Sequence, residues 1–301
     1  MLRRIKRDFW LYIYVLPALV YLFFFNYMPM YGVQVAFRLY NPALGMRNSP
    51  WVGLRYIVDF VSGFYFWTLL KNTITISVYS FLVGFPIPIV LALLLNELRH
   101  AGFKRFSQTA LYMPHFISMV VMCGIIVTFL SPSSGMINHF IRALGLEEIY
   151  FMSIPTAFKH IYVWSGIWQG MGWSAIIYLA ALSNVDPELL EAATIDGASR
   201  IQKIRYINIP TIQPTITLLL IMSIGSLIGV GFDKAFLLQN PLNVSQAEVI
   251  STYIYKRAFN NVSASSWSYS AAVGFFNNIV NLILLLFANT LARTFGNTSL
   301  F

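Results

Sequence analysis

The charged residues best placed for recognition chemistry lie together in one short run, residues 186–210, of an otherwise very apolar chain. This run holds four of the eleven acidic residues, and Arg200, Lys203 and Arg205 follow at spacings that place them near one face of a helix. Such a pattern predicts an exposed, charged surface outside a membrane. The spacing alone does not distinguish a surface that recognises another molecule from an ordinary solvated cytoplasmic loop between two membrane helices.

The local sequence of residues 186–210 predicts two short helices. Asp186 is a good N-cap and Pro187 fits the first turn, so one helix should begin there. We expect Asp196 to cap a second helix that runs to about Tyr206 and that Pro210 ends. The junction residues add almost no side-chain bulk: Ala192, Ala193, Gly197 and Ala198. Another backbone could therefore approach this junction closely.

Amides and tryptophans inside apolar runs form a second candidate site. Their spacing pairs Asn277 with Asn281 on one helix face, Trp164 with Trp168 on another, and Gln169 with Trp173 on a third. A neutral sugar needs hydrogen-bonding amides and aromatic faces, and these residues could line a path for one. The same residue types also serve as hydrogen bonds between helices and as aromatic belts at the membrane surface. We expect at least one member of the set to face the path.

No catalytic or metal-binding pattern accompanies these residues. The chain has no Gly-x-x-x-x-Gly-Lys-Ser/Thr phosphate cradle, no Gly-x-Ser-x-Gly elbow and no His-Glu-x-x-His pattern. The four histidines are scattered without ligand spacing, and His115 is interpreted as a packing residue. We therefore predict no catalytic residue, no metal site and no enzyme activity in this chain.

The composition predicts an all-α integral membrane protein. Of 301 residues, 57% are hydrophobic and 10% charged, whereas soluble domains carry about 25% charged residues. The net charge of +9 comes from residues spread over short segments between apolar runs, which favours membrane topology over nucleic-acid binding. Cys123 is the single cysteine, so no intrachain disulfide is possible. The first apolar run is too long for a cleaved signal peptide, and we expect it to be retained.

Six spans are predicted within a single domain covering residues 1–301. They lie at about 9–31, 67–95, 108–130, 158–184, 212–232 and 269–291. Residues 32–66 and 233–267 are expected to be extracytoplasmic, with a helix over 246–259, and 136–146 could form an interfacial helix. Placing the tail 1–8 in the cytoplasm puts 11 of the 20 lysines and arginines on that side. Both termini and the run 186–210 should then be cytoplasmic.

The order of residues in 186–210 resembles a known family motif. Glu191-Ala192-Ala193, Asp196-Gly197-Ala198 and Ile207-Asn208-Ile209-Pro210 closely resemble the EAA loop of binding-protein-dependent ABC importer permeases. Ile204 stands where the family often has an aromatic residue. The stretches 173–182 and 232–241 are similar to the sugar-importer branch of this family, including alginate-type importers. The similarity covers most of residues 10–295.

This resemblance implies a type I ABC importer permease with six spans and a cytoplasmic coupling helix in a bacterial inner membrane. The implied partners are a second homologous permease, two copies of a cytoplasmic ATPase subunit, an extracytoplasmic solute-binding protein and membrane lipid, with no nucleic acid. ATP and Mg²⁺ would bind the ATPase partner, so this chain would hold no cofactor. The residues implied to couple to the ATPase are Glu191, Ala192, Ala193, Asp196, Gly197, Ala198 and Arg200.

Other functions stay open on the sequence alone. The solute could be a sugar, a uronate oligomer such as an alginate oligosaccharide, glycerol phosphate, an amino acid or a peptide. An anionic solute should call for Arg or Lys within a span, and only Lys71 and Lys159 lie at span edges, which mildly favours a neutral solute. A secondary transporter would need carboxylates within spans, and the acidic residues here lie outside spans or at their ends.

Overall fold

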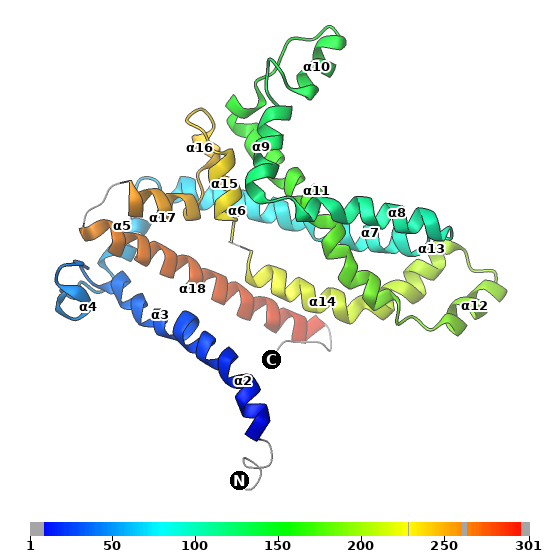
Figure 1. The fold of residues 1–301 in the computed structure, drawn as a ribbon, viewed down its shortest axis with the longest axis horizontal. Coiled ribbons are helices and arrows are strands. Elements are labelled where there is room, and N and C mark those ends of the chain that lie inside the picture. The colour runs from blue at the N-terminus through cyan, green and yellow to red at the C-terminus, as the bar shows by residue number, and fades with distance from the viewer. Residues whose placement is uncertain (1–8, 228, 261–263, 296–301) are drawn as a thin grey trace. The chain divides into compact units, whose positions relative to one another are not determined.

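A computed structural model describes residues 9–227, 229–260 and 264–295 (Figure 1). Helices account for most of these residues, and the described part contains no β-strand beyond one isolated bridge between Arg38 and Trp51. The all-α prediction is therefore confirmed for this part of the chain. The contacts divide the chain into two compact units: residues 1–64 with 254–276, and residues 65–253 with 277–301.

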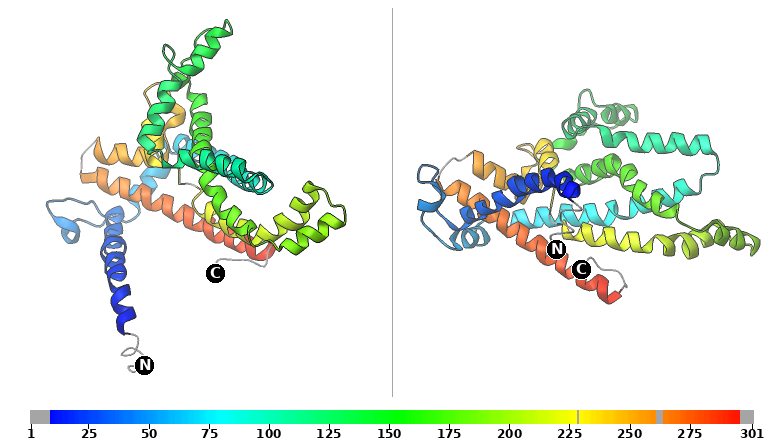
Figure 2. Two further views of the ribbon diagram at one scale, coloured as in Figure 1. Left: turned by 45° about the vertical axis from the view of Figure 1, so that its right-hand side comes forward. Right: turned by 60° about the horizontal axis from the view of Figure 1, so that its bottom comes forward.

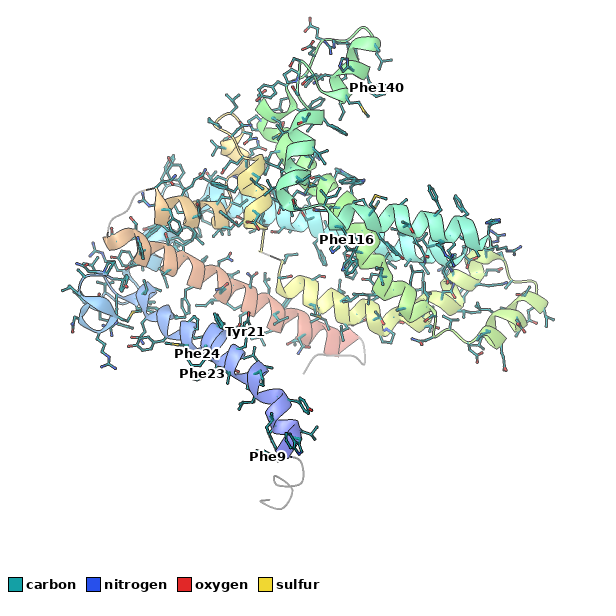
Figure 3. All side chains as sticks on the ribbon, viewed as in Figure 1. Phe9, Tyr21, Phe23, Phe24, Phe116 and Phe140 are labelled. Carbon is teal, nitrogen blue, oxygen red and sulfur yellow. The ribbon has the colours of Figure 1, made fainter. Side chains whose placement is uncertain are left out.

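The first unit is built on one long helical run, Phe9–Phe37. It comprises α2 (Phe9–Leu22), a π-helical turn (Phe23–Tyr27), α3 (Met28–Met30) and a 3₁₀ segment (Tyr31–Phe37). No residue of α2 is buried, and aromatic side chains such as Phe9, Tyr21, Phe23 and Phe24 project from the ribbon (Figure 3). The helix extends beyond the predicted end at residue 31, because residues 32–37 keep helical hydrogen bonding.

Shorter elements complete the first unit. These are α4 (Gly45–Asn48), α5 (Arg55–Val61), most of α17 (Ile250–Phe259) and the first part of α18 (Ala264–Phe295). Ala36, Tyr56 and Ala272 form its small core. The helix predicted over 246–259 is wrong as one element: α16 (Val244–Ala247) ends before α17 begins, because Glu248 adopts an extended conformation.

The second unit packs its helices around α11 (Pro155–Leu182). α11 contacts α6 (Phe66–Gly84), α7 (Pro86–Asn96), α8 (Ala101–Tyr112) and α14 (Ile209–Gly225), and the ribbons run side by side in Figures 1 and 2. One core cluster includes Ala92, Ala175 and Ile212, and another includes Met122, Phe158 and Ala235. The remaining elements of this unit are α9 (Met119–Phe129), α10 (Met136–Ala143), α12 (Pro187–Ile195), α13 (Arg200–Lys203), α15 (Phe232–Leu238), α16 and the end of α18. The interfacial helix expected within 136–146 corresponds to α10, which lies apart from α11 in both figures.

The third predicted span, 108–130, is not one helix. The segments Ala101–Phe116 and Met119–Phe129 meet at 100°, and Figure 1 shows α9 leaving α8 nearly at a right angle. Pro114 lies in a 3₁₀ turn before the bend, and the Ser118 hydroxyl accepts a hydrogen bond from Val121 N (3.4 Å) to start α9. The Gln169 side chain donates to the freed Ile117 carbonyl (2.8 Å). A proline and a new N-cap thus replace the continuous span.

The fifth span also differs from its prediction. The helical run extends from Arg200 to Gly225 without ending at Pro210, and it stops seven residues before 232. Residues Ile204–Asn208 form a π-helical turn, in which Ile209 N donates to the Ile204 carbonyl. That wider turn lets the helix pass a residue that has no N–H to donate.

Four helical runs in the described residues are long and apolar enough to cross a membrane, or five if the bent α8–α9 pair counts as one span. They are Phe9–Phe37, Phe66–Asn96, Arg200–Gly225 and Ser265–Phe287, with Ala101–Phe129 as the bent pair. The several apolar spans make the chain an integral membrane protein. α11, predicted as the fourth span, has 28 residues but does not pass this test of length and composition.

Candidate functional site

The segment around α12 and α13 forms an exposed surface at one end of the second unit (Figures 1 and 2). Asp186 caps α12 as its sequence predicts, with its carboxylate accepting a hydrogen bond from Glu188 N at 2.9 Å. None of the nine residues of α12 is buried. The chain thus extends a capped helix beyond the packed part of the unit.

Gly197 sets the geometry of the junction between α12 and α13. Its φ of +75° is the left-handed conformation that L side chains rarely adopt. Ala198 N donates to the Ala193 carbonyl (2.9 Å) and Gly197 N to the Thr194 carbonyl (3.1 Å), which together make a Schellman C-cap. The prediction that Asp196 caps the second helix is therefore wrong, because Asp196 is the C-cap residue of α12.

Ser199 takes the N-cap role at α13. Its hydroxyl accepts a hydrogen bond from Gln202 N (3.3 Å), and Ser199 N donates to the Gln202 side chain (2.7 Å), so both halves of a capping box are present. The Lys203 ammonium donates to the Thr194 hydroxyl at 2.7 Å and ties α13 back to α12. These contacts fix the relative orientation of the two short helices.

The residues at this surface divide into an exposed face and an anchored face. Of the residues that the sequence predicts to couple, Glu191, Ala192, Asp196, Gly197 and Arg200 are exposed, and Ala193 and Ala198 are half-buried. Within the described residues neither Glu191 nor Arg200 forms an ion pair. Leu190, Ile204 and Ile207 pack against the cluster that contains Tyr178 and Leu182. The charged face is thus available to another protein.

Sequence reasoning missed the apolar part of this surface. Ile195 is 87% exposed and Ile201 76% exposed, and Leu189 and Tyr206 are also exposed. Large apolar side chains that are exposed on a rigid, capped segment are typical of a protein interaction surface. The alternation of these residues with charged ones along 189–206 is the signal that could have revealed them.

A cavity of about 420 Å³ lies within the second unit, between α6, α7, α11 and α14. Its hydroxyl-bearing residues are Tyr162, Tyr178 and five serines, and its aromatic walls include Phe81, Phe85 and Trp173. The serines are Ser77, Ser80, Ser174, Ser223 and Ser226. The Ser77 hydroxyl oxygen is buried and has no hydrogen-bond partner in the described residues. Hydroxyls and aromatic rings around an open volume are the groups that recognise a sugar.

A second cavity, of about 310 Å³, shares residues with the first. Both are lined by Ser80, Gly84, Pro88, Tyr162 and Ser174. The second cavity adds Lys234 of α15, which is 5% exposed. α15 is not part of any of the helical runs that are long and apolar enough to cross a membrane. Burial lowers the pKa of Lys234 to about 8.

Of the residues predicted to line a substrate path, Trp173 lines the larger cavity. Its ring stacks on His115 at 4.4 Å between centroids, with 3° between the ring planes. This contact agrees with the packing role predicted for His115. The same cavity is lined by serines that the sequence analysis did not single out. Ser174 is adjacent to Trp173, whereas the other four serines come from segments far from it in the sequence.

The other five predicted residues do not line either cavity. Trp164 donates its indole N–H to the Tyr79 hydroxyl (2.9 Å), and Gln169 supports the α8–α9 bend. Trp168 is 44% exposed, and the buried Asn277 side-chain oxygen has no partner in the described residues. Asn281 lies one turn further along α18. Three of the five therefore have other positions: Trp164 and Gln169 form hydrogen bonds between segments, and Trp168 lies on a helix surface.

Residues 84–295 match the family described as "Binding-protein-dependent transport system inner membrane component". This match covers more than half of the chain, so the chain belongs to that family. It is the membrane-spanning permease subunit of an importer and, as a transport component, is not itself an enzyme.

Similar proteins span nearly the whole chain. Protein LplB of Bacillus subtilis (strain 168) is 42% identical over 99% of this chain and 92% of its own length. The polygalacturonan/rhamnogalacturonan transport system permease protein YteP of the same organism is 41% identical over 97% of this chain and 90% of its own. A chain of a bacterial alginate ABC transporter, crystallised with an alginate pentasaccharide-bound periplasmic protein, is 39% identical with a TM-score of 0.89. That comparison covers 100% of this chain and 99% of the other.

Proposed function

We propose that this chain forms part of the path of an ATP-driven importer for an oligosaccharide, in particular one built from uronate sugars. The cavity lined by five serine hydroxyls, Tyr162 and Trp173 is the observation that carries this proposal. Hydroxyl groups can exchange hydrogen bonds with sugar hydroxyls, and aromatic rings pack against sugar C–H surfaces. Relatives about 40% identical transport polygalacturonan or alginate, both polymers of uronate sugars.

The coupling to ATP is assigned to the α12–α13 surface. Two ATPase subunits would bind the coupling surfaces of this chain and of a second, homologous permease, and ATP and Mg²⁺ would bind to those subunits. The rigid Gly197 junction, the charged Glu191 and Arg200 and the exposed Ile195 and Ile201 support this assignment, because they combine a fixed shape with accessible polar and apolar groups. Closure of the ATPase pair would then move the helices between outward-open and inward-open states.

The membrane arrangement follows from counting α11 as a span. Its 28 residues extend about 42 Å, which is long enough to cross a bilayer. Small and aromatic polar residues lower its hydropathy, and they fit a helix enclosed by α6, α7, α8 and α14. Six spans in one permease domain would leave both termini and residues 186–210 in the cytoplasm. Residues 32–66 and 233–267 would face the periplasmic binding protein.

Purification and transport together test this proposal. Gentle purification of the tagged chain from native membranes should recover an ATPase subunit, a second permease and a solute-binding protein, identified by mass spectrometry. The recovered complex, reconstituted in liposomes, should accumulate labelled oligogalacturonate or alginate oligosaccharide only when ATP is present. A complex that accumulates peptides or amino acids but neither acidic nor neutral oligosaccharides would contradict the proposed substrate. A chain that is recovered alone would contradict the assembly.

A further inference from the structure

Lys234 is a cation buried in the second unit, 5% exposed. It lies on α15, which Ala235 and Leu238 anchor in the core at 0% and 1% exposure. α15 packs against α9 and α11, and the lysine side chain extends to Tyr162 in the N-terminal half of α11. Burying an ammonium group is costly unless something compensates its charge.

Little in this chain compensates that charge. The Lys234 ammonium donates to the Tyr162 carbonyl and lies 4.6 Å from the centre of the Tyr162 ring. Within the described residues no carboxylate lies within ion-pair distance of Lys234, and Tyr162 is the one hydrogen-bond partner recorded for it. An ammonium has three donors. Two of them therefore have no acceptor from the described part of this chain.

Gly166, which has no side chain, leaves room for the Lys234 ammonium. A Cβ added at Gly166 would lie 2.9 Å from the Lys234 nitrogen, so any larger residue there would displace it. Gly166 and Gly170 line the same 310 Å³ cavity as Lys234. This cavity shares Ser80, Tyr162 and Ser174 with the larger serine-lined cavity, so a ligand in the larger one is close to the charge.

We propose that Lys234 is a specificity-determining residue that binds the carboxylate of an acidic sugar as it passes the serine-lined cavity. The carboxylate supplies the negative charge that the cavity lining lacks, while the serine hydroxyls bind the sugar ring. This inference rests on the proposed function and adds to it the residue that distinguishes an acidic substrate from a neutral one. An ammonium that only tied α15 to α11 would act on every substrate equally.

Transport by the complete importer in liposomes separates these roles. The probes are trigalacturonate and its methyl ester, which has the same sugar ring and no carboxylate charge. Lys234→Gln keeps a donor for the Tyr162 carbonyl and removes the charge. Lys71→Gln, at an exposed lysine on α6 outside both cavities, removes the same charge elsewhere. For each probe the uptake is expressed as the ratio of variant to unmodified importer, so the preference of the binding protein cancels.

Lys234→Gln should lower trigalacturonate uptake by at least ~10-fold and change methyl-ester uptake by less than ~2-fold. Lys71→Gln should leave both ratios near one, and both variants should keep ATP hydrolysis stimulated by the loaded binding protein. If Lys234→Gln lowers both ratios equally, or neither, the inference is overturned and the proposed function stands. An unmodified importer that accumulates the ester but not the acid would overturn the inference in the same way. Uptake of neither probe would contradict the proposed function and, with it, this inference.

Discussion

The α12–α13 surface and the serine-lined cavity are built in opposite ways. The α12–α13 surface is made within 21 residues, 186–206, by local caps: Asp186, Gly197 and Ser199 each act on residues at most five positions away. The cavity is assembled from α6, α7, α11 and α14, which span residues 66 to 225. A local surface can keep its shape while the helices around the cavity move, which is what coupling to a transport cycle requires.

The largest effect should come from bulk at the local junction. Gly197→Arg places a long side chain on a residue with φ +75°, so it both strains the backbone and blocks the surface. We expect ATP-coupled uptake to fall to background while the protein still inserts in the membrane. Gly197→Ala is the matched control, because an added Cβ there meets nothing within 4 Å. It should cost only about 1 kcal/mol of backbone strain and retain part of the uptake. Normal uptake by Gly197→Arg would remove the coupling role.

A smaller loss is expected at the aromatic wall of the cavity. Trp173→Ala removes the ring that stacks on His115 and lines the cavity, and oligosaccharide uptake should fall by about 10-fold, equivalent to about 1.4 kcal/mol. Trp164→Ala serves as the control, since Trp164 lies on the same helix outside both cavities. Its uptake should change by about 2-fold or less. Equal losses in the two variants would mean that Trp173 acts through packing alone.

The sequence was sufficient for most of the local geometry of the α12–α13 surface because its determinants are local. A proline after Asp186 and a glycine at 197 specify a helix start and a helix end wherever they occur. The capping residue was misassigned because Asp196 and Ser199 both suit an N-cap, and only the position of the left-handed residue decides between them. The cavity could not be predicted in this way. Ser77, Ser174 and Ser223 are unremarkable in sequence and become a site only when three helices pack together.

Lys234 shows the same limit of sequence reasoning for charge. The sequence favours a neutral solute because lysines appear only at the edges of predicted spans. In the structure, α15 packs into the second unit and buries Lys234 beside Tyr162. The predicted third span failed for a related reason. Residues 108–130 are apolar throughout, so their hydropathy gives no sign of a break. The bend is stabilised by Gln169, which lies more than fifty residues further along the chain than Ile117.

The bend itself provides a prediction about stability. Gln169→Leu removes the donor to the Ile117 carbonyl and leaves that carbonyl unsatisfied, which should lower the free energy of unfolding by about 1–3 kcal/mol. Thermal unfolding of the purified complex measures this change. Trp168→Phe, at the neighbouring and 44% exposed position, should leave the midpoint nearly unchanged. If Gln169→Leu matches the unmodified complex, the bend does not depend on this long-range hydrogen bond.

The smallest effect should distinguish the two candidate caps. Ser199→Ala removes one half of the capping box and should destabilise α13 locally by about 1 kcal/mol. Amide hydrogen exchange at residues 200–203 should accelerate accordingly. Asp196→Ala should leave that exchange unchanged, because its carboxylate caps no helix in this structure. Faster exchange in Asp196→Ala and not in Ser199→Ala would restore the capping assignment that the sequence first favours.

The uninterrupted helix from Arg200 to Gly225 has a mechanical consequence. Its 26 residues extend about 39 Å, with the α12–α13 surface at one end and Ser223 of the cavity wall near the other. Had Pro210 broken the helix, a push on α13 would have been absorbed at the break. With the π-helical turn carrying the chain past it, a tilt of about 10° about the residues held to the core would displace the Gly225 end by about 4 Å. The chain thus contains a built-in lever between the two regions, and its pivot would lie where Ile207 and Ile212 contact the core.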